Sequence, residues 1–108
     1  MASTYTIRFP AYSNSAIVIP AKTTVFLSGF NKDLDRNYVV SVIDSFLSAH
    51  GHIADIRVPI HLTTLKLKGY AHVVFSHEAS AASAVMNTYS TILNNILQGN
   101  IYTSYAKL

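Results

Sequence analysis

The residues best suited to chemistry in this chain lie in one short stretch, residues 68–75, which reads Lys-Gly-Tyr-Ala-His-Val-Val-Phe. The stretch is typical of a β-strand, in which successive side chains point to opposite faces. Tyr70 and His72 therefore share one face, behind the cation of Lys68. The residues that alternate with them fit a core: Ala71, Val73 and Phe75. A cation followed by two rings on an open sheet face is what stacking on unpaired nucleobases requires.

Another aromatic side chain, Phe26, lies in an earlier strand that is predicted over residues 23–27. This segment is rich in β-branched and aromatic residues, which favour strands. Alternation points Val25 and Leu27 toward the core, and it points Phe26 outward together with Thr24. Phe26 is therefore available to join the other rings if the two strands are neighbours.

Helical periodicity predicts two elements between these strands and after them. Apolar residues recur at intervals of three and four over residues 36–50, which indicates an amphipathic helix with Asp33 or Asp35 as its N-cap. The alanine-rich segment 79–87 predicts a second helix. One side of this helix is expected to carry Ala82, Val85 and Met86. Residues 88–98 fit either a short strand pair or another helical turn.

Two further strands are predicted by alternation, over residues 53–58 and residues 101–106. In the first of them, Asp55 and Arg57 are expected to point outward. In the second, Tyr102 is expected to point outward. The last strand follows a Gly-Asn turn signal, which supports its start.

The predicted order of elements is β-α-β-β-α-β, which is an α+β, ferredoxin-like sandwich. In this arrangement two helices cover one face of a four-stranded antiparallel sheet, and the other face stays open. The first and third strands are neighbours in the middle of the sheet. We therefore expect Phe26, Tyr70 and His72 to meet on the open face.

Two segments resemble the signature motifs of the RNA recognition motif family. Residues 68–75 resemble its first signature, which runs basic, Gly, aromatic, small, aromatic, aliphatic, any, aromatic. His72 stands where that family usually has Phe or Tyr. Residues 25–30 resemble the second signature, with Phe30 in place of the usual Leu. The resemblance covers residues 23–107 and implies a sheet that binds single-stranded RNA, and in some members single-stranded DNA.

The resemblance also implies a role for each residue of the face. Phe26 and Tyr70 would each stack on a base, His72 would occupy the third ring position, and Lys68 would contact a phosphate. Two more candidate RNA-binding residues share the face: Arg57 and Tyr102. Because an unperturbed imidazole titrates near pH 6.5, a protonated His72 would favour RNA through its charge.

Length and composition fit one domain. The chain has 108 residues, which we divide into a leader over residues 1–22, either flexible or an accessory segment, and a domain over residues 23–107. The formal net charge is +3, with 12% charged residues, which permits nucleic-acid binding without demonstrating it. We expect a monomer.

Other residue types point away from metals, cofactors and membranes. The chain has no cysteine, so a disulfide or a thiolate metal site is excluded. His50 and His52 look like a fragment of a metal site, but no acidic cluster lies nearby, so we expect no metal and no cofactor. No apolar run approaches the ~20 residues of a membrane helix. The resemblance implies RNA processing and an intracellular location, in the nucleus or the cytoplasm, with the nucleus slightly favoured.

Two rival functions follow from the same fold. The first is a protein–protein interaction module, which the 50% hydrophobic content supports. The second is a small enzyme such as an acyl phosphatase, which would need an arginine beside an anion-binding loop. No such loop is evident, and none of the five carboxylates pairs with a histidine in the pattern. We therefore expect a binding module and not an enzyme.

Overall fold

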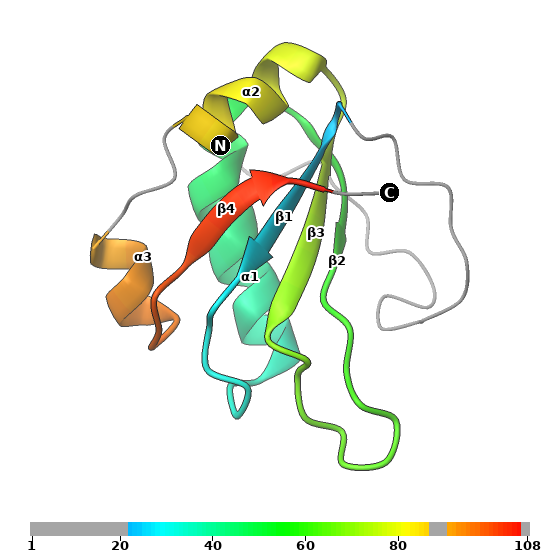
Figure 1. Ribbon diagram of the computed structural model, residues 1–108, viewed down its shortest axis with the longest axis vertical. Coiled ribbons are helices and arrows are strands. Elements are labelled where there is room, and N and C mark those ends of the chain that lie inside the picture. The colour runs from blue at the N-terminus through cyan, green and yellow to red at the C-terminus, as the bar shows by residue number, and fades with distance from the viewer. Residues whose placement is uncertain (1–21, 87–90, 107–108) are drawn as a thin grey trace.

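The computed structural model describes residues 22–86 and 91–106 (Figure 1). Its elements follow in this order: β1 (Thr24–Ser28), α1 (Arg36–Leu47), the 3₁₀ helix η1 (Ser48–His50), β2 (Ile53–Arg57), β3 (Tyr70–Phe75), α2 (Glu78–Met86), α3 (Thr91–Ile96) and β4 (Tyr102–Tyr105). The predicted leader lies outside the described residues except for Lys22.

The four strands form one antiparallel sheet in the order β2-β3-β1-β4. This confirms the predicted ferredoxin-like arrangement with β1 and β3 in the centre. In Figure 1 the sheet stands in front of α1, and α2 lies across its upper end. One face of the sheet is therefore packed against helices, and the other is the face turned toward the viewer.

The predicted alternation of β1 and β3 is confirmed by burial. Val25, Leu27 and Ala71 are fully buried on the helical side, whereas Phe26 is only partly buried. Thr24 differs from the expectation, because it points to the open face but is 0% exposed. Val74 lies beside it in β3, and the amide of Ala106 donates to its carbonyl oxygen from the other side (3.0 Å), so this end of the central strand is flanked on both edges.

Strand β2 contains a bulge that simple alternation did not predict. Its pairing with β3 shifts between Ile53 and Asp55, so Ala54 is an extra residue in the strand. Strict alternation would put Ile53 and Asp55 on the same face. The bulge instead lets Ile53 and Ile56 both enter the core, at 1% and 0% exposure, while Asp55 turns toward the open face.

Helix α1 begins and ends at the predicted signals. The Asp35 carboxylate accepts a hydrogen bond from the amide of Tyr38 (3.1 Å), which satisfies one of the free amides at the helix start. The helix passes into η1 and the chain turns away at Gly51, which has a positive φ of 146°. Four residues of α1 are buried against the sheet: Val39, Val40, Ile43 and Leu47.

Helix α2 presents a different face from the one predicted. Met86 is 84% exposed, and the buried residues are Ser80, Ala81 and Ala84. These small side chains let α2 approach the sheet and η1 closely; a Cβ on Gly51 would lie only 2.0 Å from the Ser80 hydroxyl oxygen. Of the two alternatives for residues 88–98, the helical one is confirmed over the described part, because α3 spans Thr91–Ile96. Leu93 within α3 and Leu97 just after it are buried.

A close approach of two backbone segments at Gly29 yields the first prediction. Gly29 has φ +101°, and a Cβ there would lie 2.1 Å from the carbonyl oxygen of Asn100. Gly29→Ala should lower the free energy of unfolding by about 2–4 kcal/mol, because strain and a backbone clash add. Urea unfolding measures the loss. Ser28→Ala, one residue earlier, should cost less than about 1 kcal/mol. Equal losses in the two variants would contradict the close approach.

Candidate nucleic-acid interface

Three rings from β1 and β3 gather on the open face of the sheet. The centroids of Phe26 and Tyr70 are 5.5 Å apart with their planes inclined at 29°, so these rings are stacked. The ring of His72 lies 5.5 Å from Phe26 and 5.8 Å from Tyr70, tilted against both. All three residues are half-buried. We call these residues, Phe26, Tyr70 and His72, the ring triad.

The register of the two central strands produces the ring triad. Phe26 pairs directly with His72, and Ser28 pairs with Tyr70. Tyr70 therefore reaches Phe26 along the diagonal, a distance that aromatic side chains span. The intervening residue Ala71 points into the core with 0% exposure, so the backbone cannot rotate the rings away without exposing apolar surface.

Strand β4 extends the interface on one side of the triad. Tyr102 pairs with Ser28 and is 65% exposed on the open face, as predicted. A hollow of about 340 Å³ lies between β4 and the triad. Its lining residues are Phe26, His72, Tyr102, Ser104 and Tyr105. Four of these five side chains carry rings, which suits a flat, partly polar ligand.

Strand β2 extends the interface on the other side of the ring triad, away from β4. Arg57 pairs with His72, and its Nε donates to the Asp55 carboxylate oxygen Oδ2 (3.0 Å). Alternation in the sequence predicts only that Asp55 faces outward. It does face outward, but its side chain is only 9% exposed, against 17% for Arg57. The signal for this ion pair was present, since opposite charges two residues apart on a strand share one face.

Lys68 lies just before β3 and not within it, which corrects the predicted start of the strand. Gly69 takes φ +86° and turns the chain into the strand, so Lys68 does not share a face with Tyr70 by alternation alone. The amide of Lys68 donates to the Pro59 carbonyl oxygen (3.1 Å). Within the described part of the chain Lys68 makes no ion pair.

Comparison with known proteins gives one decisive match. The profile of the family described as "RNA recognition motif" matches residues 25–96, which span both predicted signature segments and account for 72 of the 108 residues. The chain belongs to the RNA recognition motif family. No curated protein sequence matches it.

Two solved structures share the fold of this RNA recognition motif. The Rna15 RRM is 22% identical, with a TM-score of 0.59, and the match covers 79% of this chain and 90% of that one. The Rna15 RRM with bound RNA (GU) is also 22% identical, with a TM-score of 0.58 and coverage of 82% and 86%. At this identity the likeness establishes the fold.

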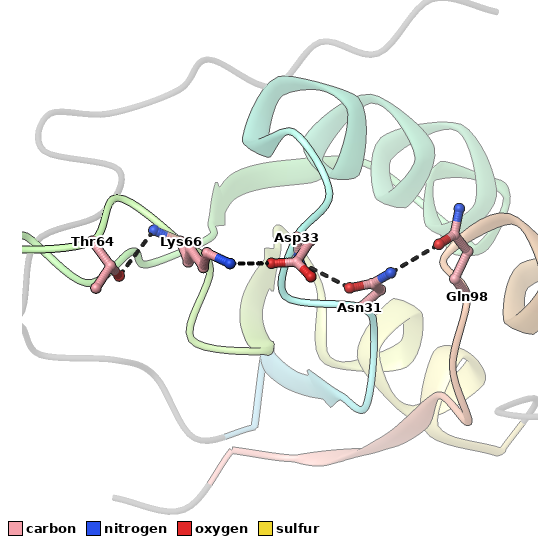
Figure 2. A network of polar contacts seen from close by, with 5 residues as sticks. All are labelled: Asn31, Asp33, Thr64, Lys66 and Gln98. Carbon is pink, nitrogen blue, oxygen red and sulfur yellow. Dashed lines mark hydrogen bonds and ion pairs between the residues drawn. The ribbon is translucent and has the colours of Figure 1, made fainter.

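A network of polar contacts holds three loops together at the end of the sheet where β1 ends and β3 begins (Figure 2). Lys66 Nζ donates to Asp33 Oδ1 (2.7 Å), and Asn31 Nδ2 donates to Gln98 Oε1 (2.8 Å). The Asp33 amide donates to Asn31 Oδ1 (2.9 Å), and the Lys66 amide donates to Thr64 Oγ1 (3.3 Å). The hydrogen bond with Asp33 raises the pKa of Lys66. Lys66 is therefore committed to this network and adds little free positive charge to the interface.

The environment of His72 lowers its pKa. Burial among the rings is the main cause, and the positive charge of Arg57 adds to it. The structure therefore favours the neutral imidazole, so an attraction of RNA by protonated His72 would act only below the usual titration range of histidine. In its neutral form the ring stacks without the cost of desolvating a charge.

The other paired histidines lie away from this face. The Nδ1 atom of His50 is 2.8 Å from the Ser83 hydroxyl, and Nδ1 of His52 is hydrogen-bonded to the Ser76 hydroxyl. Among residues 22–86 and 91–106, no three metal-ligating side chains cluster, and no helix is long and apolar enough to span a membrane.

Acid should destabilise the fold through His72. Because its pKa is lower in the folded chain, the unfolded chain takes up the proton first as the pH falls through about 6.5. The free energy of unfolding should therefore decrease below about pH 7, until the pH passes the lowered pKa. His72→Phe should remove part of this decrease; His50, whose pKa burial also lowers, accounts for a further part.

Urea unfolding of both proteins between about pH 5 and 7.5 measures the effect. His61→Asn is the matched control, a histidine variant in the exposed part of the β2–β3 loop. An identical pH dependence in His72→Phe and the wild-type protein would show that His72 does not titrate as described.

Proposed function

We propose that this RNA recognition motif binds single-stranded RNA on the open face of its sheet, with bases stacked on the ring triad. One observation carries the proposal: three rings from two adjacent strands lie within 5.5–5.8 Å of one another on the face that the helices leave uncovered. A ring cluster needed only for stability would be expected on the helical side, where the apolar core already lies.

The contributions to affinity follow from the residues of the face. Each base stacked on an aromatic ring contributes about 1–3 kcal/mol. Phe26 and Tyr70 offer the larger stacking surfaces, His72 offers a smaller one, and Lys68 supplies a phosphate contact. The ordering of a flexible strand offsets much of the gain, so we propose a dissociation constant in the micromolar range, of order ~1–100 μM.

The low net charge of the protein supports base stacking as the main contribution to RNA affinity. With a net charge of +3 and Lys66 held by Asp33, the face neutralises roughly one to three phosphates. Affinity should therefore depend only weakly on salt. That the Rna15 RRM has been solved with bound RNA (GU) supports RNA as the ligand class, and single-stranded DNA is the nearest rival ligand. We propose that residues 23–107 form the binding unit, as a monomer without catalytic activity, in the nucleus or the cytoplasm.

A second candidate function, binding of a protein, has one observation in its favour. A hollow of about 610 Å³ lies between α2 and the end of β4, away from the ring triad. It is lined by Lys22, Glu78, Ala79, Ala82, Tyr105 and Ala106. Tyr105 lines this hollow as well as the one beside the triad, so a protein segment bound here would adjoin RNA bound on the sheet.

Removal of a triad ring should weaken RNA binding strongly. Tyr70→Ala and Phe26→Ala should each raise the dissociation constant for a short single-stranded RNA by roughly 5- to 100-fold, because each removes one stacking partner. Fluorescence anisotropy with labelled oligoribonucleotides measures the change, and a parallel titration with the same sequence as DNA tests the preference for RNA.

Tyr38→Ala is the matched control for these variants. Tyr38 is 46% exposed on α1, which packs against the other face of the sheet, so its loss should leave RNA affinity unchanged. Circular dichroism establishes that each variant is folded. Folded Tyr70→Ala and Phe26→Ala proteins that bind RNA as well as the wild type would refute the stacking model.

A further inference from the structure

The residues of the open face form a row across the sheet that ends in an arginine. Arg57 on β2 pairs with His72 on β3, His72 pairs with Phe26 on β1, and Phe26 pairs with Ser104 on β4. Neighbouring strands lie about 4.8 Å apart, so each step along the row is short. Figure 1 shows the four strands side by side in this order.

We propose that Arg57, held in position by Asp55, reads the edge of a guanine base that is stacked on Phe26 and flanked by His72. The inference rests on the proposed function and adds a base preference to it. It assigns Arg57 a role in specificity and Asp55 the role of a positioning residue.

The ion pair fixes the guanidinium. Arg57 Nε donates to Asp55 Oδ2 (3.0 Å), and the two side chains are 17% and 9% exposed. The second carboxylate oxygen of Asp55, Oδ1, is buried without a hydrogen-bond partner. A buried carboxylate depends on its cation for compensation, so Asp55 restrains Arg57 strongly. The ion pair with Asp55 uses the Nε atom of Arg57. Among the described residues, neither terminal nitrogen of Arg57 makes a hydrogen bond.

The pair also changes what Arg57 can offer an RNA strand. Asp55 compensates its charge, so the pair as a unit attracts phosphates less than a lone arginine would. What remains is a rigid fork of N–H donors with no acceptor. Such a fork matches two adjacent acceptors, and guanine presents them as O6 and N7. Adenine presents an amino donor in place of O6, and the pyrimidines lack N7.

The geometry of the row places a purine within reach of this fork. In the row, Phe26 lies between His72 on β3 and Ser104 on β4, so a base stacked on Phe26 has one edge on the side of β3 and β2. The ring of His72 lies 5.5 Å from that of Phe26 and is inclined at 59° to it, so a base stacked on Phe26 meets His72 at this edge. Arg57 is the next residue of the row beyond His72, at the edge of the stacked base.

The test compares oligouridylates that carry one central purine: guanine, adenine, 7-deazaguanine, which lacks the N7 acceptor, or 2-aminopurine, which lacks O6. Wild-type protein should bind the guanine oligomer roughly 5- to 100-fold more tightly than the adenine oligomer, because a bidentate contact discriminates by that factor. Both guanine analogues should lose most of the advantage. Anisotropy titrations at one fixed salt concentration measure all four constants.

Two variants separate the roles of the pair. Arg57→Lys keeps the charge but not the fork, and Asp55→Asn keeps the shape but releases the fork. Each should reduce the preference for guanine over adenine to about two- to threefold. Arg57→Ala is avoided, because it would leave the Asp55 charge buried alone. Thermal melts establish that both variants are folded.

Distinct outcomes separate this inference from the proposed function. Wild-type protein that binds every oligomer equally well, or an Arg57→Lys variant that weakens all of them by the same factor, would overturn the guanine assignment and leave RNA binding intact. An equal loss of affinity for every oligomer in Arg57→Lys would show that Arg57 contacts a phosphate and not a base. If wild-type protein binds none of the oligomers at millimolar concentration, the proposed function itself fails, and the base preference fails with it.

Discussion

The antiparallel pairing of β1 with β3 is the constraint on which the rest of this molecule depends. Because Phe26 faces His72 in that register, the same hydrogen bonds that build the centre of the sheet also assemble the ring triad. A slip by one residue would turn Val25 and Val73 to solvent and bury the rings. The core residues on the helical side therefore fix the open face, and the stability of the fold and the proposed binding surface depend on one register.

Features around the edges of the sheet protect that register and shape the interface. The bulge at Ala54 lets Ile53 and Ile56 both enter the core while Asp55 and Arg57 turn to the open face. The polar network of Figure 2 ties the loops beside the start of β3 and occupies the Lys66 ammonium. The interface is consequently rich in rings and poor in free charge, which makes stacking and hydrogen bonding, and not general attraction of phosphate, the expected basis of binding.

Local sequence patterns were sufficient to predict the two central strands, β1 and β3, but not the details of β2 and α2. Alternation in residues 68–75 and the signature around Phe26 predicted the two middle strands and their shared face. Alternation could not predict the bulge in β2, because an extra residue reverses the pattern without changing composition. The buried face of α2 was misjudged because an alanine-rich helix has little hydrophobic contrast, and contact with η1 selected Ser80 over Met86. The ion pair of Asp55 with Arg57 was within reach of the sequence, because alternation puts the two opposite charges on one face.

The most direct test of the account is an NMR titration of the domain with a short single-stranded RNA, followed through the backbone amides. We predict that the shifts concentrate on residues 24–28 and 70–75, with smaller changes at Arg57 and Tyr102, and that the amides of α1 stay still. Shifts confined to α2 and the end of β4, or none at all up to millimolar RNA, would contradict the claim that the open face is the RNA-binding surface.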